Sequence, residues 1–338
     1  MGVSFDTSRS MVTRADIDAA RRRIKDVAFK TPLLRFPVLD DAVDGTILIK
    51  PENLQRTGSF KFRGAYNCLS QIPEKTREKG VVACSSGNHA QGVAESARLL
   101  GIPATIVMPE TAPKVKLQRT QDAGARVITY KRGVEDRYLI AADIQQQTGA
   151  TFVHPFNDPH VIAGQGTVGA EIAEQADALG LKPDAVLACT GGGGLSSGIA
   201  LALDADLPGT VFHTVEPREF DDYRRSLSTG ELQRNEKAVG SVCDALMSES
   251  PGEIGFSILS RLAGEGVAVS DNEALRAVAY AFRELKLVVE PGGAAALAAV
   301  LTGRFSARNR VVCVVLTGGN VDLAMLERAL HLGKPGMV

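Results

Sequence analysis

Short runs of β-branched and aliphatic residues alternate along the chain with longer segments whose apolar residues recur every three to four positions. In the first half of the chain, the expected strands cover residues 81–84, 104–108, 126–130 and 151–153. The segment 89–100, between the first two of them, places Val93 and Ala97 on one face of a helix. Such alternation is typical of βαβ units with parallel strands.

A second set of apolar runs predicts another sheet. These expected strands cover residues 47–50, 185–189, 211–215 and 311–316. Helical patterns separate them, and a further helix is expected over residues 14–25. We therefore predict an α/β protein with two parallel-type sheets and a ligand cleft between two domains. The predicted large domain comprises residues 1–69 and 159–338, and the predicted small domain comprises residues 70–158.

Composition narrows the classes of partner. The 338 residues include 38 Lys and Arg against 39 Asp and Glu, so no basic surface is expected for a nucleic-acid backbone or an anionic membrane. No stretch approaches the roughly 20 apolar residues of a membrane helix, and the first residues lack the apolar core of a signal peptide. We expect a cytoplasmic protein that binds small molecules. Of the five cysteines, Cys84, Cys189 and Cys313 lie in apolar runs, and we expect buried, reduced thiols.

Three glycine-containing turns follow expected strands and open expected helices. They are SSGNHAQG at residues 85–92, TGGGGLSSG at residues 190–198 and TGGN at residues 317–320. The start of a helix offers unpaired backbone N–H groups, and glycine lets the backbone approach a phosphate closely. The four glycines 191–194 are therefore the strongest candidate for a phosphate-binding turn.

That turn has three interpretations. Gly192, Gly194 and Ser197 match the dinucleotide-binding pattern only in part, because its third glycine is missing. Glu216, at the end of the next expected strand, stands at about the distance of the acidic residue that binds the ribose in such sites. A dinucleotide, the phosphate of another cofactor and a purely structural turn all remain open at this point.

The segment PENLQRTGSFKFRGA, residues 51–65, favours the second interpretation. It resembles the lysine segment of fold type II pyridoxal phosphate (PLP) enzymes, in the branch of threonine dehydratase, serine dehydratase and serine racemase. The resemblance covers about residues 13–330 through SFKFRGA, SSGNHAQG, HPFNDPHVIAGQGT, TGGGGL, VEPREFDD, VVEPGGAAALAA and LTGGNVD. It implies the two-domain fold of the tryptophan synthase β type, with the cofactor in the interdomain cleft.

The resemblance also implies how single residues would hold the cofactor. Lys61 would be the Schiff-base lysine, whose amine burial and a neighbouring cation can keep neutral and nucleophilic. Phe60 would pack against the pyridine ring, Asn88 would bond to the 3′ oxygen, and Thr317 would face the ring nitrogen. The phosphate would be held by the N–H groups of Gly191, Gly192, Gly193, Gly194 and Leu195.

Substrate contacts are implied in the same way. The substrate carboxylate would be bound by Ser85, Ser86, Gly87, Asn88 and His89. Ser86 would face Cα opposite Lys61, so these two are the expected catalytic residues. Arg137 and His154 align with positions that can face a second carboxylate, whereas the alternative for Arg137 is a solvated helix residue.

The motif VEPREFDD resembles the divalent-cation site of serine racemase-like enzymes. Its ligands would be Glu216, Asp222 and the backbone carbonyl of Phe220. Oxygen ligands of this kind suit Mg²⁺, Mn²⁺ or Ca²⁺. The alternative is a solvated acidic loop.

The implied activity is dehydration and deamination of a small β-hydroxy amino acid, such as L-threonine or L-serine, to a 2-keto acid and ammonia. Serine racemisation and dehydration of 3-hydroxyaspartate are alternatives within the branch, and the branch implies a homodimer. A β-replacement synthase of the cysteine synthase type is less favoured, because such enzymes differ around the lysine and the asparagine turn. A non-catalytic PLP-binding protein would need neither Ser86 nor the acidic ligands.

Overall fold

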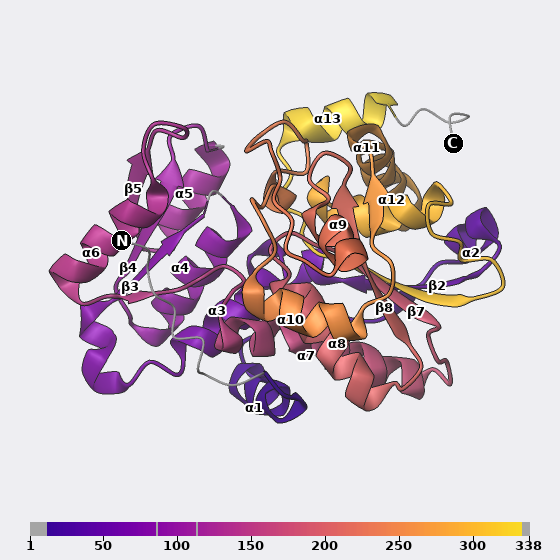
Figure 1. Cartoon of the computed structure of the whole chain (residues 1–338), viewed down its shortest axis with the longest axis horizontal. Coiled ribbons are helices and arrows are strands. Elements are labelled where there is room, and N and C mark those ends of the chain that lie inside the picture. The colour runs from indigo at the N-terminus through magenta and orange to yellow at the C-terminus, as the bar shows by residue number, and fades with distance from the viewer. Residues whose placement is uncertain (1–11, 86, 113, 333–338) are drawn as a thin grey trace.

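Two β-sheets organise the computed structural model, which describes residues 12–85, 87–112 and 114–332 (Figure 1). The larger sheet has six strands in the order β1 (Leu34–Arg35), β2 (Thr46–Pro51), β10 (Val311–Leu316), β7 (Ala185–Cys189), β8 (Val211–Pro217) and β9 (Val267–Val269). The smaller sheet has four strands in the order β5 (Arg126–Tyr130), β4 (Ala104–Pro109), β3 (Val81–Cys84) and β6 (Thr151–Phe152). Neighbouring strands run parallel except β1 and β2, which are antiparallel.

The predicted α/β class with parallel-type sheets is confirmed, and each expected strand forms close to its expected limits. The edge strands β1 and β9 were not expected, because two or three residues carry too little pattern to be recognised. Strand β2 precedes the smaller sheet in the chain but pairs with β10 of the larger sheet, from Thr46 opposite Val311 to Pro51 opposite Leu316. The domain limits at residues 70 and 158 stay a prediction.

Helices cover the sheets on both sides. They are α1 (Arg14–Ile24), α2 (Pro37–Val43), α3 (Lys61–Leu69), α4 (Asn88–Leu100), α5 (Lys114–Asp122), α6 (Arg137–Thr148), α7 (Pro159–Ala178), α8 (Gly194–Asp206), α9 (Asp222–Thr229), α10 (Glu253–Leu262), α11 (Asp271–Tyr280), α12 (Ala295–Leu301) and α13 (Leu323–Leu332). In Figure 1, α4, α5 and α6 accompany the smaller sheet at the left, whereas α7 and α8 lie below the larger sheet and α11 to α13 above it. Within the described part of the chain, no helix is both long enough and apolar enough to cross a bilayer.

Strand β10 shows why its sequence is apolar at every position. Val312 and Val314 pack into the core formed with α11 and α12, whereas Cys313 and Val315 pack into the core formed with α7 and α8. A parallel strand covered on both faces has no solvent-facing side chains. The prediction for the cysteines is confirmed, because all five are buried and free.

Helix α3 packs very closely against α7, and two glycines permit the approach. A Cβ on Gly64 would lie 2.7 Å from the carbonyl oxygen of Val161, and a Cβ on Gly164 would lie 2.6 Å from the Cα of Gly64. Any larger residue would push the helices apart. Because α3 begins at Lys61, this contact sets the position of that lysine.

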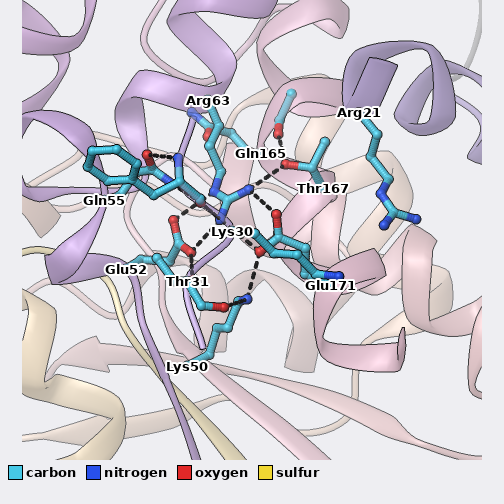
Figure 2. A network of polar contacts seen from close by, with 12 residues as sticks. Arg21, Lys30, Thr31, Lys50, Glu52, Gln55, Arg63, Gln165, Thr167 and Glu171 are labelled. Atoms are coloured by element: carbon cyan, nitrogen blue, oxygen red, sulfur yellow. Dashed lines mark hydrogen bonds and ion pairs between the residues drawn. The ribbon is translucent and has the colours of Figure 1, made fainter. Parts of the chain in front are cut away.

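A buried set of four charged residues, here called the Arg63 cluster, reinforces the same contact (Figure 2). It consists of Lys50, Glu52, Arg63 and Glu171. Arg63 donates to both carboxylates, with shortest distances of 2.7 Å to each, and Lys50 Nζ donates at 2.7 Å to Glu171. Two positive and two negative charges thereby join β2, α3 and α7.

Candidate functional site

Lys61 lies half-buried at the N-terminal end of α3. Its Nζ donates a 2.9 Å hydrogen bond to the carbonyl oxygen of Pro155 and lies 5.1 Å from the centroid of the Phe60 ring. In the described part of the chain, no carboxylate forms an ion pair with this lysine. Burial lowers the pKa of Lys61 to about 8, which brings a neutral, nucleophilic amine within reach near neutral pH.

The carboxyl end of β10 holds the segment that carries Phe60 and Lys61. The carbonyl oxygen of Thr317 accepts a 3.2 Å hydrogen bond from the backbone N–H of Phe60. The Oγ1 of Thr317 lies 2.8 Å from the Sγ of Cys189, at the end of the neighbouring strand β7. Burial raises the pKa of the Cys189 thiol to about 12, so the thiol stays protonated and neutral. Thr317 thus lies beside the segment that carries Lys61, and its hydroxyl contacts a neutral thiol.

The glycine turn at residues 191–194 leads from β7 into α8. Gly193 has a φ of +89°, the left-handed conformation that glycine adopts without strain. A Cβ on Gly192 would lie 2.2 Å from the Phe156 ring, and a Cβ on Gly193 would lie 1.9 Å from the Tyr223 hydroxyl. The packing therefore demands glycine. The first N–H groups of α8, starting at Gly194, have no acceptor within the helix and suit an anion.

Asn88 begins α4, and two partners hold its amide group. Its Nδ2 donates to the buried carboxylate of Glu290, and its Oδ1 accepts a 2.8 Å hydrogen bond from Asn320. The second oxygen of Glu290 is buried and has no hydrogen-bond partner among the described residues. Burial raises the pKa of Glu290. The amide orientation is therefore set, with one N–H proton of Nδ2 beyond the bond to Glu290.

The rest of the predicted carboxylate-binding turn is described in part. The backbone N–H of Gly87 donates to Ser85 Oγ at 3.2 Å, which closes the turn before α4. Ser86 lies outside the described residues. The His89 ring lies 3.1 Å from the carbonyl oxygen of Val153, and burial with the nearby Lys61 charge lowers its pKa to about 3. Its side chain is thus neutral and tied to the backbone.

Arg137 and His154, which are far apart in the sequence, come close to each other through Tyr138. The guanidinium carbon of Arg137 lies 4.8 Å from the centroid of the Tyr138 ring, and that ring stacks nearly parallel to His154 at 6.5 Å. Burial, and then the charges of Lys61 and Arg137, lower the pKa of His154 to about 3. The structure therefore brings Arg137 and His154 together, and it places His154 near Lys61.

The predicted cation ligands Glu216 and Asp222 lie close together and are buried. The two oxygens of Glu216 accept hydrogen bonds of 2.8 and 2.7 Å from the N–H groups of Tyr223 and Arg224. Burial, and then the neighbouring Asp222, raise the pKa of Glu216 well above its usual range. Phe220 is fully buried. Within the described residues, no three His, Cys, Asp or Glu side chains cluster as metal ligands, so any site here depends on backbone oxygens.

Three residues beside the site were not predicted from the sequence to belong to it. Glu290 lies within a quoted motif, and an acidic residue between apolar runs is a signal of burial that could have identified it. Cys189 directly precedes the glycine turn, but nothing in its neighbours indicated a contact with Thr317. Tyr138 sits in a polar helix start, where a tyrosine is unremarkable without its three-dimensional partners.

Comparisons with known proteins bear on this geometry. A family model described as pyridoxal-phosphate dependent enzyme matches residues 24–318. The L-threonine ammonia-lyase of Thermotoga maritima is 42% identical over 325 residues, covering 96% of this chain and 79% of that enzyme. The L-threo-3-hydroxyaspartate ammonia-lyase of a Pseudomonas species is 41% identical over 308 residues, covering 91% of this chain and 95% of that enzyme. The structure of maize serine racemase is similar with a TM-score of 0.88 and 32% identity, covering 95% of this chain and 98% of that one.

Proposed function

We propose that this chain, which belongs to the pyridoxal-phosphate dependent enzyme family, eliminates water from a small β-hydroxy amino acid. The products are a 2-keto acid and ammonia. The observation that carries the proposal is Lys61, half-buried, without a carboxylate partner in the described part of the chain and with a pKa of about 8. Similar proteins named L-threonine ammonia-lyase and L-threo-3-hydroxyaspartate ammonia-lyase support the proposal.

The residues present fit the cofactor. The glycine turn leaves no room for a Cβ at Gly192 or Gly193 and offers backbone N–H groups for the phosphate, including that of Leu195. Phe60 lies beside Lys61, where an aromatic face can pack on a ring. Asn88 has a fixed amide that can donate to the 3′ oxygen.

When bound, PLP supplies an electron sink that makes the Cα proton of an amino acid acidic. The chain then supplies the proton transfers, with the Lys61 amine as the base at Cα. The Thr317 hydroxyl is neutral. A ring nitrogen that faced it would therefore not be held protonated, as it would be by a carboxylate. That arrangement favours prompt loss of a β-hydroxyl over transamination. Ser86 is proposed to face Cα from the other side, and Ser85 to His89 to bind the substrate carboxylate.

L-Threonine and L-serine are the proposed substrates, and 3-hydroxyaspartate is a second candidate. Arg137 favours the second, because it is half-buried and, among the described residues, pairs with no carboxylate. A guanidinium contact to a β-carboxylate would contribute about 1.5–3 kcal/mol. We then expect 3-hydroxyaspartate to exceed threonine in kcat/KM by roughly one to two powers of ten. Arg137→Ala should erase that preference and leave threonine dehydration nearly intact.

Glu216 and Asp222 are proposed to bind Mg²⁺, Mn²⁺ or Ca²⁺ with the carbonyl oxygen of Phe220. Two buried carboxylates lie together, and neither forms an ion pair within the described residues. The Oδ2 of Asp222 is buried and has no hydrogen-bond partner there. A divalent cation would satisfy both carboxylates.

We also propose a cytoplasmic homodimer. Buried, reduced cysteines suit a reducing compartment. Leu54 and Val288 are 48% and 44% exposed, and they lie near each other because Asn53 donates a 3.1 Å hydrogen bond to the carbonyl oxygen of Val288. Sedimentation of the wild type and of Leu54→Lys tests the dimer, which should dissociate in the variant.

The decisive experiment is a screen for ammonia release over L-threonine, L-serine, D-serine and the 3-hydroxyaspartates, with the chirality of the remaining serine measured. Lys61→Ala should lose both turnover and the visible absorption of the bound cofactor, because the covalent link and the proton transfer use the same amine. Dehydration with normal cofactor colour in that variant would overturn the proposal. Racemised serine without ammonia would favour the racemase alternative.

A further inference from the structure

A row of three aromatic side chains connects the start of α6 with the glycine turn. The ring centroids of Tyr138 and His154 lie 6.5 Å apart with nearly parallel planes, and those of His154 and Phe156 lie 4.6 Å apart at 88°. Phe156 packs against Gly192, where a Cβ would lie 2.2 Å from the ring. The row therefore forms a continuous series of contacts from Tyr138, beside the smaller sheet, to the glycine turn that follows β7 of the larger sheet.

Arg137 is attached to the Tyr138 end of this row in two ways. Its Nη2 donates a 3.2 Å hydrogen bond to the Tyr138 hydroxyl, and its guanidinium carbon lies 4.8 Å from the centre of the ring. The helix start is itself secured, because Asp136 caps the backbone N–H of Tyr138 at 2.7 Å. An arginine side chain has many rotamers. The hydrogen bond to the Tyr138 hydroxyl and the contact with the Tyr138 ring together reduce the number that Arg137 can adopt.

The charge of Arg137 has no internal counterpart in the described part of the chain. It is half-buried, and the neighbours that act on it most are the side chains of Tyr138, Tyr130 and Cys84, none of which is a carboxylate. A partly desolvated cation without a carboxylate partner is well suited to an anionic ligand. The next ring in the row also stays neutral: His154 Nδ1 accepts hydrogen bonds from the N–H groups of Phe156 and Asn157.

We propose that Tyr138 is a positioning residue that holds the guanidinium of Arg137 ready for the second carboxylate of a dicarboxylic β-hydroxy amino acid. This inference rests on the proposed function and adds to it the residue that sets the substrate class. Tyr138 acts through Arg137 and the aromatic row, without touching the reacting atoms. A prearranged guanidinium loses less conformational freedom on binding, which strengthens the contact with the carboxylate.

The test compares Tyr138→Phe with the wild type on L-threo-3-hydroxyaspartate and on L-threonine. Because Arg137 is then no longer prearranged and must be ordered on binding, KM for the dicarboxylic substrate should rise about three- to tenfold. The kcat for that substrate and both constants for threonine should stay within about twofold. Tyr138→Leu, which also removes the ring, should raise the same KM further. The control is Tyr280→Phe, which loses a 3.2 Å hydrogen bond to the carbonyl of Val38 and should change neither substrate.

A binding measurement gives a second readout that does not require turnover. Calorimetry should show succinate binding about three- to tenfold more weakly to Tyr138→Phe than to the wild type, with butyrate unchanged. This inference alone is overturned if the wild type dehydrates threonine but Tyr138→Phe raises KM for both substrates equally, or for neither. A wild type that releases ammonia from no β-hydroxy amino acid overturns the proposed function, and the inference with it.

Discussion

The Arg63 cluster and the pair Glu216 and Asp222 both bury two carboxylates, but they balance the charge differently. In the Arg63 cluster, the cationic side chains of Lys50 and Arg63 contact the carboxylates at 2.7 Å (Figure 2). In the pair, the donors to Glu216 are backbone N–H groups and the donor to Asp222 is the amide of Asn235. Neither acid of the pair meets a Lys or Arg in an ion pair within the described residues.

The difference separates a structural role from a binding role. A buried carboxylate in contact with an internal cation is already compensated and holds elements together, as the Arg63 cluster does for β2, α3 and α7. A buried carboxyl group that has only neutral donors has a raised pKa, and it becomes fully ionised when a cation binds and compensates the charge. Equal burial therefore does not imply equal function, and the two sites should respond in opposite ways to substitutions and to added ions.

The largest expected effect is that of Arg63→Met. The variant leaves the carboxylates of Glu52 and Glu171 buried without their main partner, which should lower the free energy of unfolding by about 3–5 kcal/mol. Urea denaturation followed by circular dichroism measures the change. The matched control is Arg304→Met, which breaks the half-exposed pair with Glu273 and should cost less than about 1 kcal/mol. Equal midpoints for Arg63→Met and Arg304→Met would contradict the structural role.

The second prediction concerns added cations. Mg²⁺, Mn²⁺ or Ca²⁺ at a hundred times its Kd should stabilise the wild type by about 2.7 kcal/mol, and a chelator should reverse the gain. Thermal unfolding measures both. Glu216→Gln should lose the response, whereas Glu219→Gln, an exposed neighbour in the same motif paired with Lys237, should keep it. If neither the cation nor the chelator changes the melting temperature of the wild type, Glu216 and Asp222 do not bind a cation.

The smallest expected effect concerns the way the free energy of unfolding falls at acid pH. It arises from Glu52 in the Arg63 cluster. Burial alone would raise the pKa of Glu52, but the Arg63 guanidinium outweighs it and lowers the pKa. A carboxyl whose pKa is lower in the folded state stabilises the protein above its unfolded pKa, and that stability is lost as pH falls through the folded value. Unfolding measured between about pH 6 and 3 should therefore show a shallower loss for Glu52→Gln than for wild type. Parallel curves would contradict the assignment.

Much of the molecule followed from the sequence alone. The strands at residues 81–84, 185–189 and 311–316 were recognisable because each is a continuous apolar run between turns, and all three form. The lysine segment and the glycine turns indicated the PLP family that the comparisons support. These features are local, since a few neighbouring residues determine both the backbone conformation and the chemistry that they carry.

Other features depend on residues that only the tertiary structure brings together. Lys50 ends an apolar strand and looks like a solvated lysine, yet it is fully buried because Glu171, 121 residues further on, meets it at 2.7 Å. Tyr138 becomes informative only beside Arg137 and His154. The sequence determined which strands, turns and reactive residues this protein has. The tertiary structure decided which charges are paired, because the partner of a buried charge is chosen by packing between elements distant in the chain.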